Sequence, residues 1–210
     1  MIHYPPAAMR ETSGTETRIL NAAREIFAER GRRRATVREI CTRAKVNVAA
    51  VNYHFGSKDK LYAAALQSAT TEHFARHPIP LEVGTNPTDR LRTVIAAIAS
   101  TILAPRPAWH DRLLMAELSD PSPALDRMVR DFVRPRFDVL CAALKSFLPN
   151  LSKRELELHA LSVSGQLFYY KNARAVVTRL LGMPALSPGL VAEVVEHVTD
   201  FTLRAIGGKR

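Results

Sequence analysis

Long hydrophobic runs are missing from this 210-residue chain, although hydrophobic residues make up 47% of it. The longest uncharged helical candidate, residues 93–104, is shorter than the roughly 20 apolar residues that a membrane-spanning helix needs. Residues 1–14 contain two prolines and no apolar stretch, so we expect a flexible tail and no secretory signal. These absences predict a cytoplasmic protein without a membrane-spanning segment.

Cysteine is also scarce, since Cys41 and Cys141 are the only two and show no metal-ligand spacing. Two such thiols suit a reducing compartment, where we expect both to pack as small apolar residues. The seven histidines are scattered. His73 and His77 share a helical face, but Pro78 follows and a third ligand is not evident. Because no Ser/His/Asp grouping and no glycine-rich phosphate loop is present, we predict no enzyme activity, metal or cofactor.

Positive charge is abundant and concentrated near the N-terminus. The formal net charge is +10, and residues 1–60 hold 12 Lys and Arg against 6 Asp and Glu. The remaining residues hold 18 against 14, a much weaker bias over a longer stretch. This distribution predicts an anionic partner for the N-terminal segment, and charge alone leaves nucleic acid and membrane surface both open.

Turns that join strands in hairpins, Asn-Gly and Asp-Gly, are absent, whereas helical periodicity is nearly continuous. An apolar stripe predicts a helix over 15–30 that stops at Gly31. The sequence from Thr36 to Glu39 is a capping box for a second helix, and Asn47 can cap a third. Three helices this short, with a tight turn at 45–47, predict a helix-turn-helix unit.

Further helices are expected beyond this unit, at 57–75, 88–104, 109–118, 122–148, 152–181 and 188–206. Pro135 should kink or split the fourth of these. The predicted fold is therefore all-α, with a three-helix head on a larger helical body. We expect a tail at 1–14, a helix-turn-helix domain at 15–57, and a larger helical domain at 58–210.

The third helix presents an unusual outer face. Val51 and Phe55, four residues apart, should face inward, which leaves Val48, Ala49, Asn52 and Tyr53 outside. Small residues allow close approach to base edges, an asparagine can pair with adenine, and a tyrosine hydroxyl can reach phosphate. Lys58 begins the next helix, where backbone N–H groups already favour an anion. A plain three-helix core with solvated polar residues is the alternative, and the charge bias favours DNA.

The stretches TETRILNAAREIFAERG and TVREICTRAKVNVAAVNYHFGSKDKLY resemble the DNA-binding head of the tetracycline-repressor (TetR) family of bacterial regulators. The resemblance covers residues 15–66 and implies a homodimer with two recognition helices in successive major grooves. It also implies that 15–57 is the DNA-binding domain and 58–210 the effector-binding and dimerisation domain. By position, it implies phosphate contacts for Thr36, Tyr53 and Lys58. It implies base-edge contacts for Arg38, Val48, Ala49 and Asn52. His54 matches a position near the backbone, or it packs at the helix end.

The chain departs from the family pattern at several places. Lys45 stands where the turn usually has glycine, so the turn tolerates a side chain or Lys45 reaches the DNA backbone. Val48, Ala49 and Ala50 replace more polar readers, which makes Asn52 the best single candidate for specificity. The run Arg32 to Arg34 is unusually basic, either as a solvated run or as a phosphate contact. With Lys45 and the cap Asn47, the predicted DNA-binding set is Thr36, Arg38, Lys45, Asn47, Val48, Ala49, Asn52, Tyr53, His54 and Lys58.

The body resembles a TetR subgroup with an EL-x-DPSPALD segment, here starting at Glu117, and a Gly-Gln pair at 165–166. Apolar stripes along 156–181 and 191–205 predict a four-helix dimer interface, the alternative being that they face only the monomer core. Leu161 and Phe168 lie on another side of the first helix, which favours the dimer. A mostly apolar effector pocket is expected among the middle helices, lined by Trp109, Met115, Phe132, Arg136, Gln166 and Tyr169. For each of these residues, ordinary packing in the core is the alternative.

The sequence thus predicts a ligand-responsive dimeric DNA-binding regulator, a repressor that a small molecule of unknown identity releases from a palindromic operator. An alternative is a non-specific nucleoid-type protein that contacts only the DNA backbone, which the small residues at 48–50 would suit. The large helical body argues against that alternative, because backbone binding does not need it.

Overall fold

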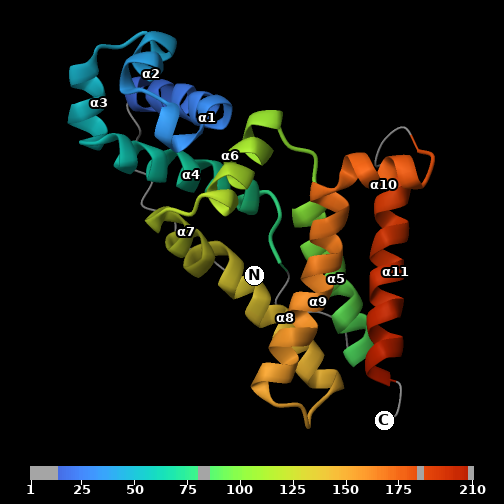
Figure 1. The fold of residues 1–210 in the computed structure, drawn as a ribbon. Helices are drawn as coiled ribbons and strands as arrows, with labels where there is room; N and C mark the ends of the chain where they lie inside the picture. Colours follow the sequence, from blue (N-terminus) through green and yellow to red (C-terminus); the bar gives the residue numbers. More distant parts are fainter. Residues whose placement is uncertain (1–13, 80–85, 184–186, 208–210) are drawn as a thin grey trace. The chain divides into compact units, whose positions relative to one another are not determined.

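The computed structural model describes residues 14–79, 86–183 and 187–207. Within these ranges the regular secondary structure is entirely helical (Figure 1), as predicted. The described residues form two compact units. We call 14–76 with 105–133 the head unit, and 77–104 with 134–207 the body unit. The predicted tail lies outside the described residues, except for Gly14, which begins the first helix.

The head unit begins with helix α1, Gly14–Arg34, in which Gly31 has non-helical angles (φ 73°, ψ 162°). The predicted stop at Gly31 is therefore a break in the helix, and one more turn follows it. Helices α2 (Val37–Ala44), α3 (Val48–Phe55) and α4 (Lys58–Ala75) come next. Helix α6 (Ala108–Ser119), helix α7 (Pro123–Met128) and the π-helical segment η1 (Val129–Val133) complete the unit.

Local capping explains where these helices start. The amide of Glu39 donates to Thr36 Oγ1 (3.2 Å), and the Thr36 amide donates to Glu39 Oε2 (2.9 Å), which confirms the capping box. The Ala50 amide donates to Asn47 Oδ1 (2.8 Å), so Asn47 caps α3 as predicted. Ser57 caps α4 in the same way.

One apolar cluster holds the head unit together. It includes Ile19 and Phe27 of α1, Ile40 of α2, Val51 of α3 and Leu61 of α4, all at most 1% exposed. Leu113 of α6 belongs to the same cluster. Packing therefore joins α4 and α6 to the helix-turn-helix unit. The predicted functional boundary at residue 57 stays a prediction, because packing does not test which helices DNA binding requires.

The body unit consists of α5 (Pro87–Leu103), α8 (Arg134–Phe147), α9 (Lys153–Asn172), α10 (Arg174–Leu180) and α11 (Pro188–Gly207). Helix α5 packs against α8, α9 and α11 (Figure 1). A second apolar cluster, with Leu91, Ile95, Leu140, Leu144 and Leu167 among its fully buried members, fills the unit.

Two predicted helices are interrupted. Residues 122–148 form α7, η1 and α8, because Pro135 has no N–H to continue the helical ladder and the π-helical segment directly precedes it. The predicted single helix at 152–181 is wrong, since α9 ends at Asn172 and Ala173 (φ −96°, ψ 19°) separates it from α10. The side-chain amide of Asn172 donates to the Phe168 carbonyl (2.9 Å) at this end.

The apolar stripe predicted for a dimer lies mainly in the monomer core. Leu156, Ala160, Val163, Leu167 and Val177 are all at most 7% exposed. The periodicity predicted a stripe correctly but could not say which partner it meets. The opposite face of α9 is the one that remains open, with Leu161 and Phe168 exposed.

Candidate DNA-binding surface

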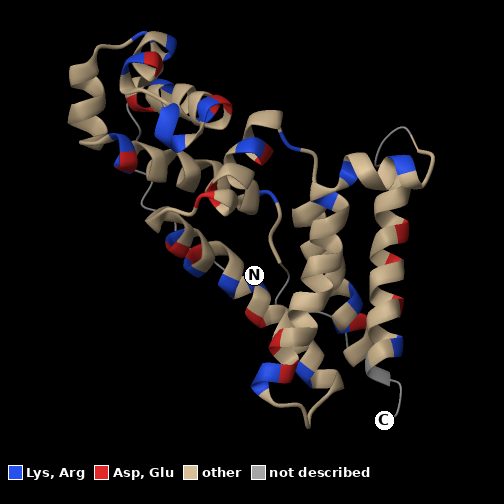
Figure 2. Ribbon diagram, in the orientation of Figure 1, with Lys and Arg blue, Asp and Glu red and all other residues tan. Residues whose placement is uncertain are grey.

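The outer face of α3 has the predicted arrangement. Val51 is buried at 1% exposure, whereas Val48, Ala49, Asn52 and Tyr53 are exposed, Tyr53 at 86%. Helix α3 carries no Lys, Arg, Asp or Glu (Figure 2). An exposed amide among small side chains can approach a base edge closely. This face can therefore read bases, while charge for the DNA backbone has to come from neighbouring elements.

The turn before α3 tolerates a side chain at a left-handed position. Lys45 has φ 55° and ψ 50°, and it is the only described non-glycine residue with positive φ. Its amide donates to the carbonyls of Cys41 and Thr42 and so ends α2. Lys45 and Asn47 are both exposed.

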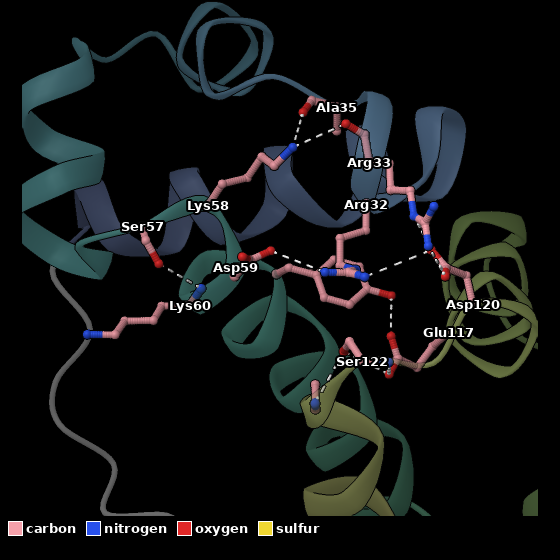
Figure 3. Close-up of polar contacts among 12 residues, drawn as sticks. Arg32, Arg33, Ala35, Ser57, Lys58, Asp59, Lys60, Glu117, Asp120 and Ser122 are labelled. Atoms are coloured by element: carbon pink, nitrogen blue, oxygen red, sulfur yellow. Dashed lines mark hydrogen bonds and ion pairs between the residues drawn. The ribbon is translucent and has the colours of Figure 1, made fainter.

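Lys58 has a structural role that the sequence did not reveal. Its Nζ donates to the carbonyls of Arg33 (3.2 Å) and Ala35 (3.1 Å), as Figure 3 shows. These bonds tie the start of α4 to the segment between α1 and α2. An ammonium group has three donors, so one remains for a phosphate. Thr36 likewise serves its helix cap, while its side chain stays exposed.

His54 and Arg38 differ in how far their side chains are exposed to solvent. His54 is half-buried, with its ring 5.1 Å from Tyr53 and 6.2 Å from Phe55 between centroids, so packing occupies much of it. Arg38 is exposed on α2. The whole predicted set therefore lies on α2, α3, the turns before them and the first turn of α4, with roles in DNA binding that stay predictions.

The cations of the head unit fall into two groups. Eight arginines form ion pairs within the unit, namely Arg24, Arg30, Arg32, Arg33, Arg43, Arg76, Arg106 and Arg130. Within the described residues 30–60, five cations form no ion pair, namely Arg34, Arg38, Lys45, Lys58 and Lys60. Figure 2 shows the corresponding mixture of both signs on α1 and α2. The second group supplies charge that can meet DNA phosphates.

A buried carboxylate fixes the turn between α6 and α7. Glu117 is 0% exposed, and it accepts hydrogen bonds from the Tyr62 hydroxyl (2.7 Å) and from the Ser122 amide and hydroxyl (both 2.9 Å). Burial, followed by the bond to Glu117, raises the pKa of Tyr62 well above its ordinary value. Tyr62 also packs edge-on against Phe27, with ring centroids 5.0 Å apart. The EL-x-DPSPALD segment therefore anchors α6 and α7 to α4.

Asp120, in the same turn, binds the end of α1. Arg33 donates through Nε (3.0 Å) and Nη2 (2.8 Å) to the two oxygens of Asp120. Arg32 lies 3.9 Å from Asp120 and 3.4 Å from Asp59 (Figure 3). The sequence singled out both the arginine run and the Asp120 segment, but a separation of 87 positions concealed that they meet.

The predicted effector residues divide between the units. Trp109, Met115 and Phe132 belong to the head unit, where Arg24 lies over the Trp109 ring (5.4 Å) and Phe132 stacks on Phe74 (5.3 Å). Their shared role in one pocket stays a prediction.

The other three predicted effector residues, Arg136, Gln166 and Tyr169, belong to the body unit. Arg136 is 6% exposed and donates to the His77 carbonyl (3.0 Å). Burial lowers the pKa of its guanidinium to about 10. Gln166 is half-buried and Tyr169 is 52% exposed.

A groove of about 320 Å³ lies between α8 and α9. Five of its eight lining residues are charged, namely Arg134, Asp138, Lys145, Lys153 and Glu157, and the other three are Cys141, Ala142 and Leu156. None of the predicted effector residues lines it. In the described ranges no cluster of three or more His, Cys, Asp or Glu could hold a metal ion. No described helix is long and apolar enough to cross a membrane.

Comparison with known proteins assigns both parts of the chain. Residues 19–65 match the family model described as bacterial regulatory proteins, tetR family. Residues 87–206, more than half of the chain, match the C-terminal domain of the HTH-type transcriptional dual regulator CecR. The HTH-type transcriptional repressor Rv3405c of Mycobacterium tuberculosis is 33% identical over 122 residues, 57% of this chain and 59% of that protein. The match thus spans about three-fifths of that relative.

Solved structures show the same fold. FadR from Bacillus subtilis, in complex with stearoyl-CoA, superposes with a TM-score of 0.62 at 15% identity, over 89% of this chain and 96% of FadR. AibR, in complex with isovaleryl coenzyme A and operator DNA, gives 0.61 at 14% identity, over 89% and 97%. The family models and these relatives describe transcription regulators rather than enzymes. The chain therefore belongs to the TetR family of bacterial transcription regulators, with a C-terminal domain of the CecR type.

Proposed function

We propose that the protein is a homodimeric repressor that binds a palindromic operator and leaves it when an anionic small molecule binds the body unit. The observation that carries the DNA-binding part is the outward face of α3, where Asn52 and Tyr53 are exposed over the buried Val51. In this proposal Asn52 reads a base, and Lys58 and Thr36 bind flanking phosphates.

The dimer is supported by apolar residues that the body unit leaves exposed. On α9 they follow the three-and-four spacing of one helical face, which includes Leu158, Leu161, Phe168 and Tyr169. Further exposed apolar residues are Val176 and Leu180 on α10 and Phe201 on α11. Large exposed apolar patches commonly mark protein interfaces. A two-fold symmetric partner would cover this face and set two copies of α3 at a fixed spacing.

An acyl-coenzyme A is the ligand class that we propose first. FadR and AibR, which share the fold, were solved with stearoyl-CoA and isovaleryl coenzyme A. Arg136 supports an anionic ligand, because its guanidinium is buried in the body unit and, with a pKa of about 10, stays charged at neutral pH. A buried guanidinium binds phosphate or carboxylate oxygens strongly.

Genomic fragments enriched on the immobilised protein would identify the operator, and fluorescence anisotropy would then follow its release. Stearoyl-CoA and isovaleryl-CoA are the probes, with free coenzyme A and free fatty acid as controls. We expect one acyl-CoA to weaken operator binding at least tenfold, and Arg136→Met to lose that response while it still binds operator. Release by neither probe would contradict the proposed ligand class. Enrichment of no sequence would instead favour non-specific binding.

A further inference from the structure

Arg33 lies next to two of the predicted phosphate contacts. Its carbonyl accepts a hydrogen bond from Lys58, and Thr36, the cap of α2, is three positions further along. The side chain of Arg33 is 78% exposed. A long cation at this place is within the part of the head unit that would face a DNA backbone.

Unlike Arg34 and Arg38 nearby, Arg33 is engaged by a carboxylate. Asp120 accepts both of its hydrogen bonds in a bidentate pair, at 3.0 and 2.8 Å, and lies 3.9 Å from Arg32 as well. A bidentate carboxylate offers a guanidinium the same oxygen geometry as a phosphate. Because Asp120 is 44% exposed, the pair is open to water, and such pairs contribute little to stability. A DNA phosphate can therefore compete for Arg33.

Asp120 is held in place by a buried network rather than by a loose loop. Three residues before it, Glu117 of α6 is fully buried and accepts hydrogen bonds from Tyr62 of α4 and from Ser122 at the start of α7. A satisfied buried network of this kind defines one arrangement of the elements that it joins. The position of the Asp120 carboxylate therefore depends on how α6 and α7 are docked on α4.

We propose that Arg33 contacts the DNA backbone when its ion pair with Asp120 is broken. Docking of the turn between α6 and α7, which positions Asp120, therefore weakens DNA binding. This rests on the proposed function, since it assumes that the head unit binds DNA. Residues 105–133 are joined to the body unit at both ends, at 104–105 and 133–134. A change in the body unit can thus shift this segment and alter whether Arg33 pairs with Asp120 or with a DNA phosphate.

Fluorescence anisotropy of the full chain on a duplex of random sequence tests the proposal, because phosphate contacts do not depend on sequence. At about 0.1 M salt, we expect Asp120→Asn to bind about 3- to 10-fold more tightly. The slope of log affinity against log salt should steepen by about 0.9, the value for one additional phosphate contact. Asp120→Ala, which also removes the oxygen acceptors, should behave in the same way and serves if the first variant does not fold.

The matched control is Asp126→Asn, which removes the same charge from an exposed position on α7 and should leave the slope unchanged. The double variant Arg33→Gln/Asp120→Asn should bind the random duplex no more tightly than the single variant Arg33→Gln. A gain that survives in the double variant, or equal or weaker binding by folded Asp120→Asn, would overturn the proposal. If the wild-type protein bound neither random duplex nor operator, the proposed function would itself fail.

Discussion

At the residue scale, single side chains that join distant segments define the head unit. Tyr62 and Glu117 are 55 positions apart in the sequence and meet in a buried hydrogen bond. A buried carboxylate is costly unless its oxygens are satisfied, and three donors satisfy Glu117 here. The removal of one donor therefore has a measurable cost.

Tyr62→Phe should lower the free energy of unfolding by about 1–3 kcal/mol, because one buried oxygen of Glu117 loses its partner. Tyr53→Phe, on an 86% exposed ring, is the control and should change it by less than about 0.5 kcal/mol. Chemical denaturation followed by circular dichroism measures both. Equal stability of the two variants would show that the bond contributes nothing.

The raised pKa of Tyr62 also predicts a pH dependence. Because the pKa of Tyr62 is higher in the folded state than the unfolded value of 10.0, its contribution to the free energy of unfolding is complete below pH 10. Above pH 10 the unfolded tyrosine ionises first, so the wild-type protein should lose stability relative to Tyr62→Phe as the pH rises. Denaturation at pH 8, 10 and 11 checks the sign, and a constant difference between the two proteins would contradict it.

Lys45 shows the cost of a side chain at positive φ. Lys45→Gly and Lys45→Ala remove the same charge, but only glycine adopts this conformation freely. We expect the glycine variant to be more stable than the alanine variant by about 1 kcal/mol. Thermal and chemical denaturation compare them, and equal stability would mean that the left-handed turn carries no strain.

At the scale of secondary-structure elements, the sequence predicted what short-range interactions determine. The starts of α2, α3, α4 and α9 follow from Thr36, Asn47, Ser57 and Ser152, whose side chains accept hydrogen bonds from amides three positions further along. The break at Ala173 was missed, because the apolar periodicity continues through it.

Longer-range features of the candidate site could not be predicted. Periodicity identified an apolar stripe on α9 but not the helix that covers it, since that depends on packing between distant segments. The bond from Lys58 to the Arg33 carbonyl and the pair of Arg33 with Asp120 likewise join residues 25 and 87 positions apart. The outer face of α3, in contrast, followed from local spacing alone.

Gly165 provides a test of the proposed dimer face on α9. It is exposed, and a Cβ at this position would meet nothing within 4 Å in the monomer. Gly165→Ala should stabilise the isolated helix by up to about 1 kcal/mol, whereas Gly165→Leu should shift a dimer toward monomer by preventing close approach of a partner helix. Sedimentation equilibrium measures the monomer–dimer association constant of each variant. An unchanged association constant for the leucine variant would place the interface elsewhere.

At the scale of the whole molecule, the chain passes between the head and body units at 76–77, 104–105 and 133–134. Two of these three connections flank the segment that contains α6, with Glu117, and the turn before α7, with Asp120. A ligand that changes the body unit can therefore act on the head unit through this segment and through α4. In the proposed function, the exposed face of α3 is the surface that binds the operator or leaves it.

The most direct test of this account compares operator and scrambled duplex by fluorescence anisotropy at moderate salt, for the wild-type protein and for Asn52→Ala. Asn52 is exposed on α3, so its truncation should leave the fold intact, which circular dichroism verifies. We expect the wild-type protein to prefer its operator by a hundredfold or more. Asn52→Ala should lose about 1–3 kcal/mol of that preference while it binds scrambled duplex as before. Equal affinity of the wild-type protein for both duplexes would contradict sequence-specific reading by α3.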